Sequence, residues 1–420
     1  MVIAEIRFPR FEICPIRFLQ FMLSLSSRRL SVNQGRSVFS QIFSFIDYEV
    51  FRRCVRKYDG DKHVRRFSCW EQFLALAFAQ LTHREGLRDI EVSLNAHARH
   101  LYHSGFHSLV KKSTLADANE SRDWRIFAEF GQSLIQQAQS LYAGSDLGLE
   151  LDGVLYALDS STIDLSLTLF PWAPYERSRA AIKLHTLLDL NSSIPVFIDI
   201  TDVRGHDSYA LDHLFVEPGC FIVMDRGYVD FPRLFQLHQS MAYFVLRAKK
   251  NIQFHRRCSH PIDRSTGVRS DQTIILTGVF SKNDFPSPLR RVSFYAADID
   301  KRFVFLTNNF HIPSTTVAAI YKQRWQVELF FKWIKQHLRI KRFFGTSPNA
   351  VKIQIWTAIS TYVLIAIVRR KLDLDFSLHT ILQILSTTLF EKTPVPLVFQ
   401  RYNDEISNRP SSNQLNLFEI

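Results

Sequence analysis

The stretch GVLYALDSSTIDL, residues 153–165, decides the fold of this 420-residue chain. Its residues 154–158 form a short apolar run that is rich in branched and aromatic side chains, which predicts a buried β-strand. Asp159 follows this run directly. An acid at the carboxyl end of a buried strand lies where open α/β sheets place their ligand sites, although such an aspartate more often forms a turn or caps a helix.

The segments that follow predict the rest of a sheet. Residues 180–190 (AAIKLHTLLDL) and 194–202 (IPVFIDITD) flank a turn and predict an antiparallel hairpin. Helix and strand patterns then alternate, with a fourth strand at 220–225 and a fifth at 241–248. Three strands first, then helix and strand in alternation, is the order of a ribonuclease H-like α/β core.

Two further acids repeat or complement the first. In CFIVMDRGY, residues 220–228, Asp225 follows an apolar run in the same way as Asp159. Glu328 lies far downstream, among cations. Two strand-end aspartates and one helical glutamate together suit a three-carboxylate magnesium site.

The segment YKQRWQVELFFKWIK, residues 321–335, predicts a helix that carries this glutamate. At about 100° per residue, Tyr321, Arg324, Glu328 and Lys335 fall within an arc of about 60°. The apolar side chains of the segment lie beside that arc, so the polar stripe borders the buried side of the helix. This pattern suits a metal ligand flanked by phosphate-binding groups, without deciding for it from this helix alone. A surface salt-bridge ladder between Arg324 and Glu328 explains the same spacing.

Together, these motifs resemble the DDE transposases of bacterial insertion sequences, in particular the group named for its YREK signature. The motifs that carry the resemblance are DSST at 159–162, DRGY at 225–228, and the spacing of Tyr321, Arg324, Glu328 and Lys335. Further similar segments are KLHTLLDL around Lys183 and His185, FVFLTNN at 303–309, and SPNAVKIQIWTAISTYVLIAIV at 347–368. The resemblance extends from about residue 35 to about residue 372.

The resemblance implies a role for each acid. Asp159, Asp225 and Glu328 would be the catalytic residues and the metal ligands, holding two Mg²⁺ or Mn²⁺ ions. Asp159 would bridge the two ions, and each of the other acids would complete one side.

It also implies a set of DNA contacts. Tyr321, Arg324 and Lys335 would bind phosphates of the element end. Lys183 and His185 alternate onto one face of the second strand and would also approach DNA, whereas a structural role in the hairpin is the alternative. Whether DNA hairpins form as intermediates is left open by the sequence.

Composition agrees with a nucleic-acid partner. Lys and Arg total 52 against 40 acidic residues, which gives a formal net charge of +12 and a pI near 9.5. This excess favours a polyanionic partner, either nucleic acid or an anionic membrane surface. The five cysteines are odd in number and show no paired metal spacing, which indicates reduced thiols in a cytoplasmic protein without a zinc site. The resemblance to DNA-acting transposases implies association with the nucleoid.

Two apolar stretches bear on a membrane location. Residues 353–368 include polar side chains and fall short of the roughly 20 residues needed to cross a bilayer, so they predict a buried core helix. Residues 18–25 weakly imitate a secretory signal, but Glu5 and Glu12 interrupt the basic region before them. We therefore predict no membrane partner.

Four segments are predicted along the chain. Residues 1–33 form a poorly ordered extension, 34–145 a helical DNA-binding domain, 146–375 the ribonuclease H-like catalytic domain, and 376–420 a C-terminal helical segment and tail. Residues 249–310 carry Pro, Gly and Ser between strand patterns and predict a β-rich insertion within the catalytic domain.

The helical segment contains a dense basic run, FRRCVRKYDGDKHVRRF at residues 51–67, around a turn at Gly60. Such a run is often only a solvated face. Among helices joined by short turns on a basic protein, it also suits a helix-turn-helix DNA reader. In the family that the chain resembles, the N-terminal helical domain binds the element's terminal repeat.

The sequence thus predicts a DNA transposase that excises and joins an insertion sequence by cut-and-paste chemistry. It would act as a homodimer on two terminal inverted repeats and a target duplex. A related metal-dependent nuclease that cuts without joining needs the same three acids. A sequence-specific DNA-binding protein that has lost catalysis is the third possibility, and the intact acids argue against it.

Overall fold

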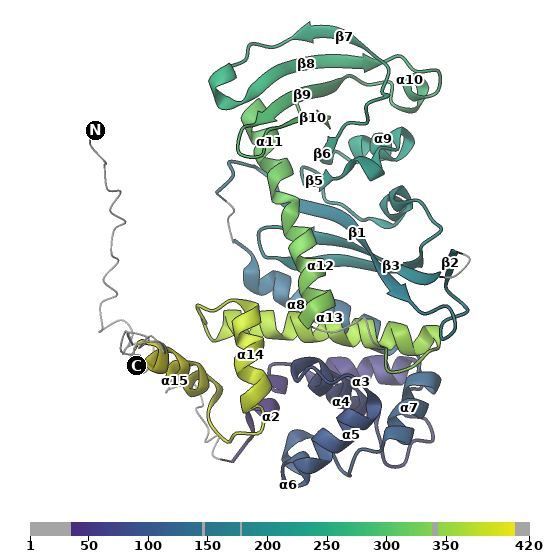
Figure 1. Ribbon diagram of the computed structural model, residues 1–420, viewed down its shortest axis with the longest axis vertical. Coiled ribbons are helices and arrows are strands. Elements are labelled where there is room, and N and C mark those ends of the chain that lie inside the picture. The colour runs from purple at the N-terminus through teal and green to yellow at the C-terminus, as the bar shows by residue number, and fades with distance from the viewer. Residues whose placement is uncertain (1–34, 145–147, 177–178, 338–342, 408–420) are drawn as a thin grey trace, which may run out of the picture.

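The computed structural model describes residues 35–144, 148–176, 179–337 and 343–407. One long sheet stands above a layer of helices that includes α13 and α8, and most of the other N-terminal helices lie on the other side of that layer (Figure 1). The extension predicted for residues 1–33 lies outside the described residues.

The N-terminal block is helical, as the sequence predicts. Its helices are α2 (Val38–Phe43), α3 (Tyr48–Lys57), α4 (Cys69–Leu81), α5 (Leu87–Ala96), α6 (Ala98–Leu101), α7 (Lys112–Ser121) and α8 (Arg125–Tyr142). Ser68 and Glu71 form a capping box that fixes the start of α4. Nearly all side chains of α4 are buried, so it is the central helix of the block.

The first part of the sheet has the predicted ribonuclease H-like order. Its strands are β1 (Leu155–Leu165), β2 (Pro174–Glu176), β3 (Arg179–Asp189), β4 (Ile194–Asp202), β5 (Phe221–Met224) and β6 (Tyr243–Arg247). β3 pairs antiparallel with both β1 and β4, whereas β1, β5 and β6 are parallel neighbours. Helix α9 (Phe231–Gln239) connects β5 to β6, and the 3₁₀ turns η2 (Asp207–His213) and η3 (Arg226–Tyr228) flank β5.

The predicted insertion is β-rich and extends the same sheet. Its strands are β7 (Phe254–Ser259), β8 (Val268–Leu276), β9 (Leu289–Ala296) and β10 (Lys301–Thr307), and the short helix α10 (Ser281–Asp284) lies between β8 and β9. β10 pairs antiparallel with β6, so core and insertion share one hydrogen-bonded ladder. The insertion therefore sits on the core through a strand edge and has no separate sheet of its own.

The segment predicted as one helix around Glu328 forms two, α11 (Ser314–Gln323) and α12 (Trp325–His337). They meet at Arg324, whose amide donates to the carbonyl of Tyr321 while its own carbonyl accepts from Val327. These bonds span three residues, as in a 3₁₀ turn, and such a tightening inside a helix often marks a functional position.

Helix α13 (Pro348–Lys371) joins the helical block to the sheet. It is the one helix of the described chain long and apolar enough to span a membrane, but 94% of its apolar window is buried inside the protein. α8 packs along it from the N-terminal block, and α12 contacts it from the sheet side. The prediction of a buried core helix at 353–368 is confirmed by this burial.

The C-terminal helices return to the N-terminal block. α14 (Leu378–Thr388) packs against α4 and α15 (Val395–Ser407) against α2. The amides of Val38 and Phe39 donate to the carbonyls of Glu391 and Leu389. The two ends of the described chain therefore form one helical unit, built around the same buried core as α13.

Candidate active site

The two predicted strand-end aspartates lie side by side. β1 and β5 pair in parallel with Leu158 opposite Met224. Asp159 and Asp225 are the next residues along the chain, so they are neighbours where the parallel pairing ends. β5 ends directly before Asp225, as predicted, whereas β1 continues to Leu165, so Asp159 lies within its strand and not at the carboxyl end that the sequence predicts.

The helix pair α11–α12 contacts both aspartates. Tyr321 Oη donates to Asp225 Oδ1 at 3.1 Å. Arg324 Nη1 donates to Asp159 Oδ2 at 2.9 Å, and its Nη2 donates to Glu328 Oε1 at 2.5 Å. The Arg324 side chain is only 15% exposed and bridges helix to strand, so the alternative of a solvated salt-bridge ladder does not describe it.

Burial and neighbouring charges shift the pKa values of two residues at this site. Burial is the main reason that the pKa of Asp159 is raised to about 6; the Ser160 amide and Arg324 oppose this rise, and the charges of Glu328 and Asp225 add to it. Burial followed by the charge of Asp225 raises the pKa of Tyr321 to about 12, so its phenol remains a donor at neutral pH.

These acids fit a divalent cation by their chemistry. In the described part of the chain, no three His, Cys, Asp or Glu side chains are arranged to hold a metal ion directly. The Arg324 guanidinium lies between Asp159 and Glu328 and supplies the positive charge there. Carboxylate oxygens are the ligands that Mg²⁺ prefers, and a cation would favour the charged form of Asp159, which burial and the nearby acids disfavour.

Lys335 attaches α12 to the first strand. Its Nζ donates to the backbone carbonyl of Thr162 in β1 at 2.6 Å, and the side chain is half-buried. Lys335, the fourth residue of the polar stripe predicted on this helix, therefore contacts the same strand that carries Asp159.

The side chains of the other two predicted DNA-contacting residues, Lys183 and His185, are largely buried. Lys183 forms an ion pair with Asp207 at 2.9 Å, and its side chain is only 12% exposed. His185 is buried, and its Nε2 lies 3.0 Å from Thr201 Oγ1. This geometry agrees with the structural alternative for both residues.

Sequence reasoning missed Asp207. Its Oδ1 accepts from Ser160 Oγ at 2.8 Å, and the Ser160 amide in turn donates to Asp159. The ion pair with Lys183 and the bond from Ser160 outweigh burial and lower the pKa of Asp207. The loop between β4 and β5 carries no sequence motif that marks Asp207 as a functional residue. Its partners Ser160 and Lys183 lie on β1 and β3, so only the folded structure brings them to it.

Known proteins share this organisation. The family described as Transposase DDE domain matches residues 150–364, and a domain of unknown function (DUF4372) matches residues 34–107. The putative transposase y4zB of Sinorhizobium fredii is 33% identical over 294 residues, covering 68% of this chain and 79% of that protein. The probable transposase for insertion sequence element IS5377 of Geobacillus stearothermophilus is 33% identical over 212 residues, covering 50% and 55%.

Among solved structures, the piggyBac transposase synaptic complex with hairpin DNA, determined by cryo-EM, aligns with a TM-score of 0.43 and 15% identity, covering 88% of this chain and 84% of that one. The strand order and the family match define a transposase with a ribonuclease H-like core. The chain belongs to the DDE transposases of bacterial insertion sequences, so it is a DNA transposase that acts with divalent metal ions.

Proposed function

We propose that Asp159, Asp225 and Glu328 are the catalytic acids of a cut-and-paste reaction and would hold two Mg²⁺ or Mn²⁺ ions. The observation that supports this most is that one helix pair contacts both aspartates and carries the glutamate. Two such ions supply the charge that stabilises the attacking and leaving oxygens of a phosphodiester. The protein's own part is to hold two of the acids at β1 and β5 and the third on α12, next to them.

Tyr321, Arg324 and Lys335 would bind the backbone of the element end next to these acids, as in the YREK group. All three lie on α11–α12 or at their junction, and their polar atoms reach β1 and the end of β5. Cationic and phenolic donors at fixed positions orient a phosphodiester for in-line attack.

The N-terminal helical block would recognise the terminal inverted repeat. Arg53, Arg65 and Arg66 are exposed on and after α3, and none forms an ion pair with a described residue. Uncompensated arginines on a helical surface suit phosphate and base contacts. A homodimer would then bring two element ends together in the cytoplasm, on chromosomal DNA.

The test is cleavage and joining of duplexes that carry the element's inverted repeats, with a plasmid as target. We expect the wild-type protein to cut and join in Mg²⁺, and Glu328→Gln to bind the ends but do neither. Asp164→Asn is the matched control, because Asp164 lies on β1 but is exposed and outside the site. Cuts without joining in the wild type would indicate a nuclease, and an active Glu328→Gln protein would overturn the assignment.

A further inference from the structure

A cleft of about 550 Å³ opens beside Asp225, and none of its lining residues belongs to α11 or α12. Its walls come from the η2 and η3 turns and from the connection between β6 and β7. The lining residues are His206, Asp207, Asp225, Arg226, Gly227, Lys249, Lys250 and Asn251. Asp225 therefore neighbours two different groups of side chains, those of α11 and α12 and those that line this cleft. No other residue belongs to both groups.

The cleft carries excess positive charge. Arg226 and Lys250 are exposed, and neither forms an ion pair with any described residue. Lys249 Nζ donates only to the Val229 carbonyl, at 3.2 Å. Of the two acids in the wall, Asp207 is already paired with Lys183. Three cations thus surround a space in which Asp225 is the one carboxylate without a lysine or arginine partner among the described residues.

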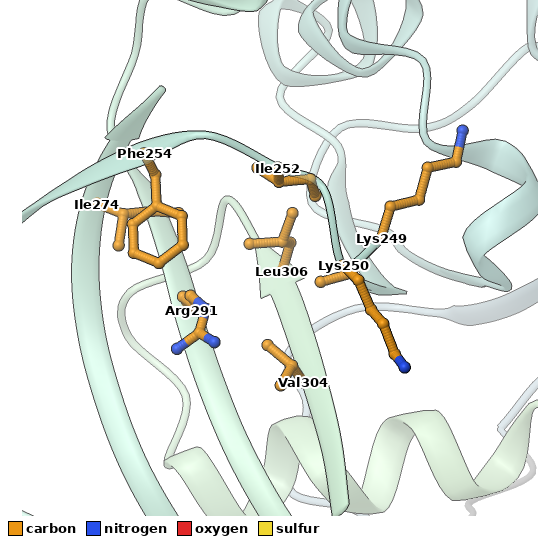
Figure 2. A pocket seen from close by; sticks show the side chains of 9 residues that line it. Lys249, Lys250, Ile252, Phe254, Ile274, Arg291, Val304 and Leu306 are labelled. Atoms are coloured by element: carbon orange, nitrogen blue, oxygen red, sulfur yellow. The ribbon is translucent and has the colours of Figure 1, made fainter. Parts of the chain in front are cut away.

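The backbone directly before the two lysines is hydrogen-bonded to the neighbouring strand β10. They follow β6 directly, and the Ala248 amide donates to the Val304 carbonyl of β10 at 2.8 Å. The same two lysines also line a second pocket, where the Arg291 guanidinium lies 5.0 Å from the centre of the Phe254 ring. Figure 2 shows the Lys249 and Lys250 side chains leaving the chain in different directions from this packed junction, so they can contact different phosphates.

We propose that this cleft binds the backbone of the DNA strand that continues past the scissile phosphate. Before cleavage that strand is the DNA flanking the element, and during joining it is the target. The inference rests on the proposed function, because joining requires two DNA segments at the same acids. Tyr321, Arg324 and Lys335 serve the element end, and the cleft supplies a second set of phosphate-binding cations on a separate wall.

The experiment compares two duplexes, one that ends flush at the element terminus and one that continues through one helical turn of flanking DNA. Binding is titrated in Ca²⁺ so that cleavage does not interfere. Lys250→Glu should weaken the extended duplex by about fivefold or more and leave the flush duplex within about twofold. Lys282→Glu is the control, because Lys282 is an exposed lysine on α10 and lines none of the cleft.

A second readout is the joining of pre-cut ends to plasmid in Mg²⁺, which Lys250→Glu should reduce although flush-end binding persists. Equal loss on both duplexes, or no loss, would overturn the proposal. Weaker binding of the extended duplex with unchanged joining would overturn the assignment to target DNA. Failure of the proposed function is seen separately, as a wild-type protein that binds ends but never cuts them.

Discussion

Arg324 Nη1 lies 2.9 Å from Asp159 Oδ2, although the two residues are 165 positions apart in the chain. The same guanidinium reaches Glu328 one helical turn away. One cation therefore holds a strand acid and a helix acid together while both are largely screened from water. Any divalent ion that binds these carboxylates competes with Arg324 for them.

The first prediction follows from this competition. Arg324→Ala leaves two acids facing each other, so the free energy of unfolding should fall by about 1–3 kcal/mol in EDTA. Ca²⁺ should then raise the melting temperature of Arg324→Ala more than that of the wild type, since it has no guanidinium to displace. Lys322→Ala, at an exposed neighbouring position, is the control. Equal Ca²⁺ shifts in all three proteins would contradict the idea.

The second prediction concerns the helical block. Replacing Arg53, Arg65 and Arg66 with alanine should bring the affinity for the terminal repeat close to that for a scrambled duplex, and should lower the salt dependence of binding. Gel-shift titrations with both duplexes measure this. Point changes are needed because removing the block would expose the apolar surface of α13. A retained preference for the repeat would count against terminal-repeat recognition by this surface.

The third prediction tests how the insertion is held. Arg290 and Asp271 form two hydrogen bonds of 3.0 and 2.7 Å, both side chains are buried, and Arg290 also donates to the Ile312 carbonyl before α11. Asp271→Ala should cost about 3–5 kcal/mol, because it leaves a buried guanidinium unpaired. Asp212→Ala breaks the more exposed pair with Arg233 and should cost no more than about 1 kcal/mol. Denaturant titration distinguishes them, and similar losses would be the contrary result.

The fourth prediction addresses the joint between the block and the core. A Cβ at Gly131 of α8 would lie 2.9 Å from the Trp356 ring and 3.0 Å from Ser360 Oγ, both on α13. Gly131→Ala should therefore destabilise the protein by about 1–3 kcal/mol. At Gly86 the same substitution meets open space and should change stability by only about 0.5 kcal/mol. Thermal unfolding of the two variants gives the comparison, and an unperturbed Gly131→Ala protein would argue against close packing here.

Much of the catalytic core was predictable because its signals are local. The apolar runs before Asp159 and Asp225 lie in β1 and β5, although β1 continues past Asp159 to Leu165, and the order of the strands along the chain is that of the ribonuclease H-like sheet. Because β1 and β5 pair in parallel, the residues that follow the paired positions Leu158 and Met224 become neighbours. The helical spacing of Tyr321, Arg324 and Glu328 likewise keeps them on one face, despite the tightening at Arg324.

Other features were decided only by the tertiary structure. No local pattern shows that Lys183 pairs with Asp207 and so leaves the surface, or that Lys249 and Lys250 meet Arg226 beside Asp225. The helical block, α13 and the C-terminal helices share one core because each has an apolar face that only another segment can cover. Spacing along the chain determines which side chains share a face of a helix or strand, whereas packing between distant segments determines which faces meet and which charges remain open to DNA.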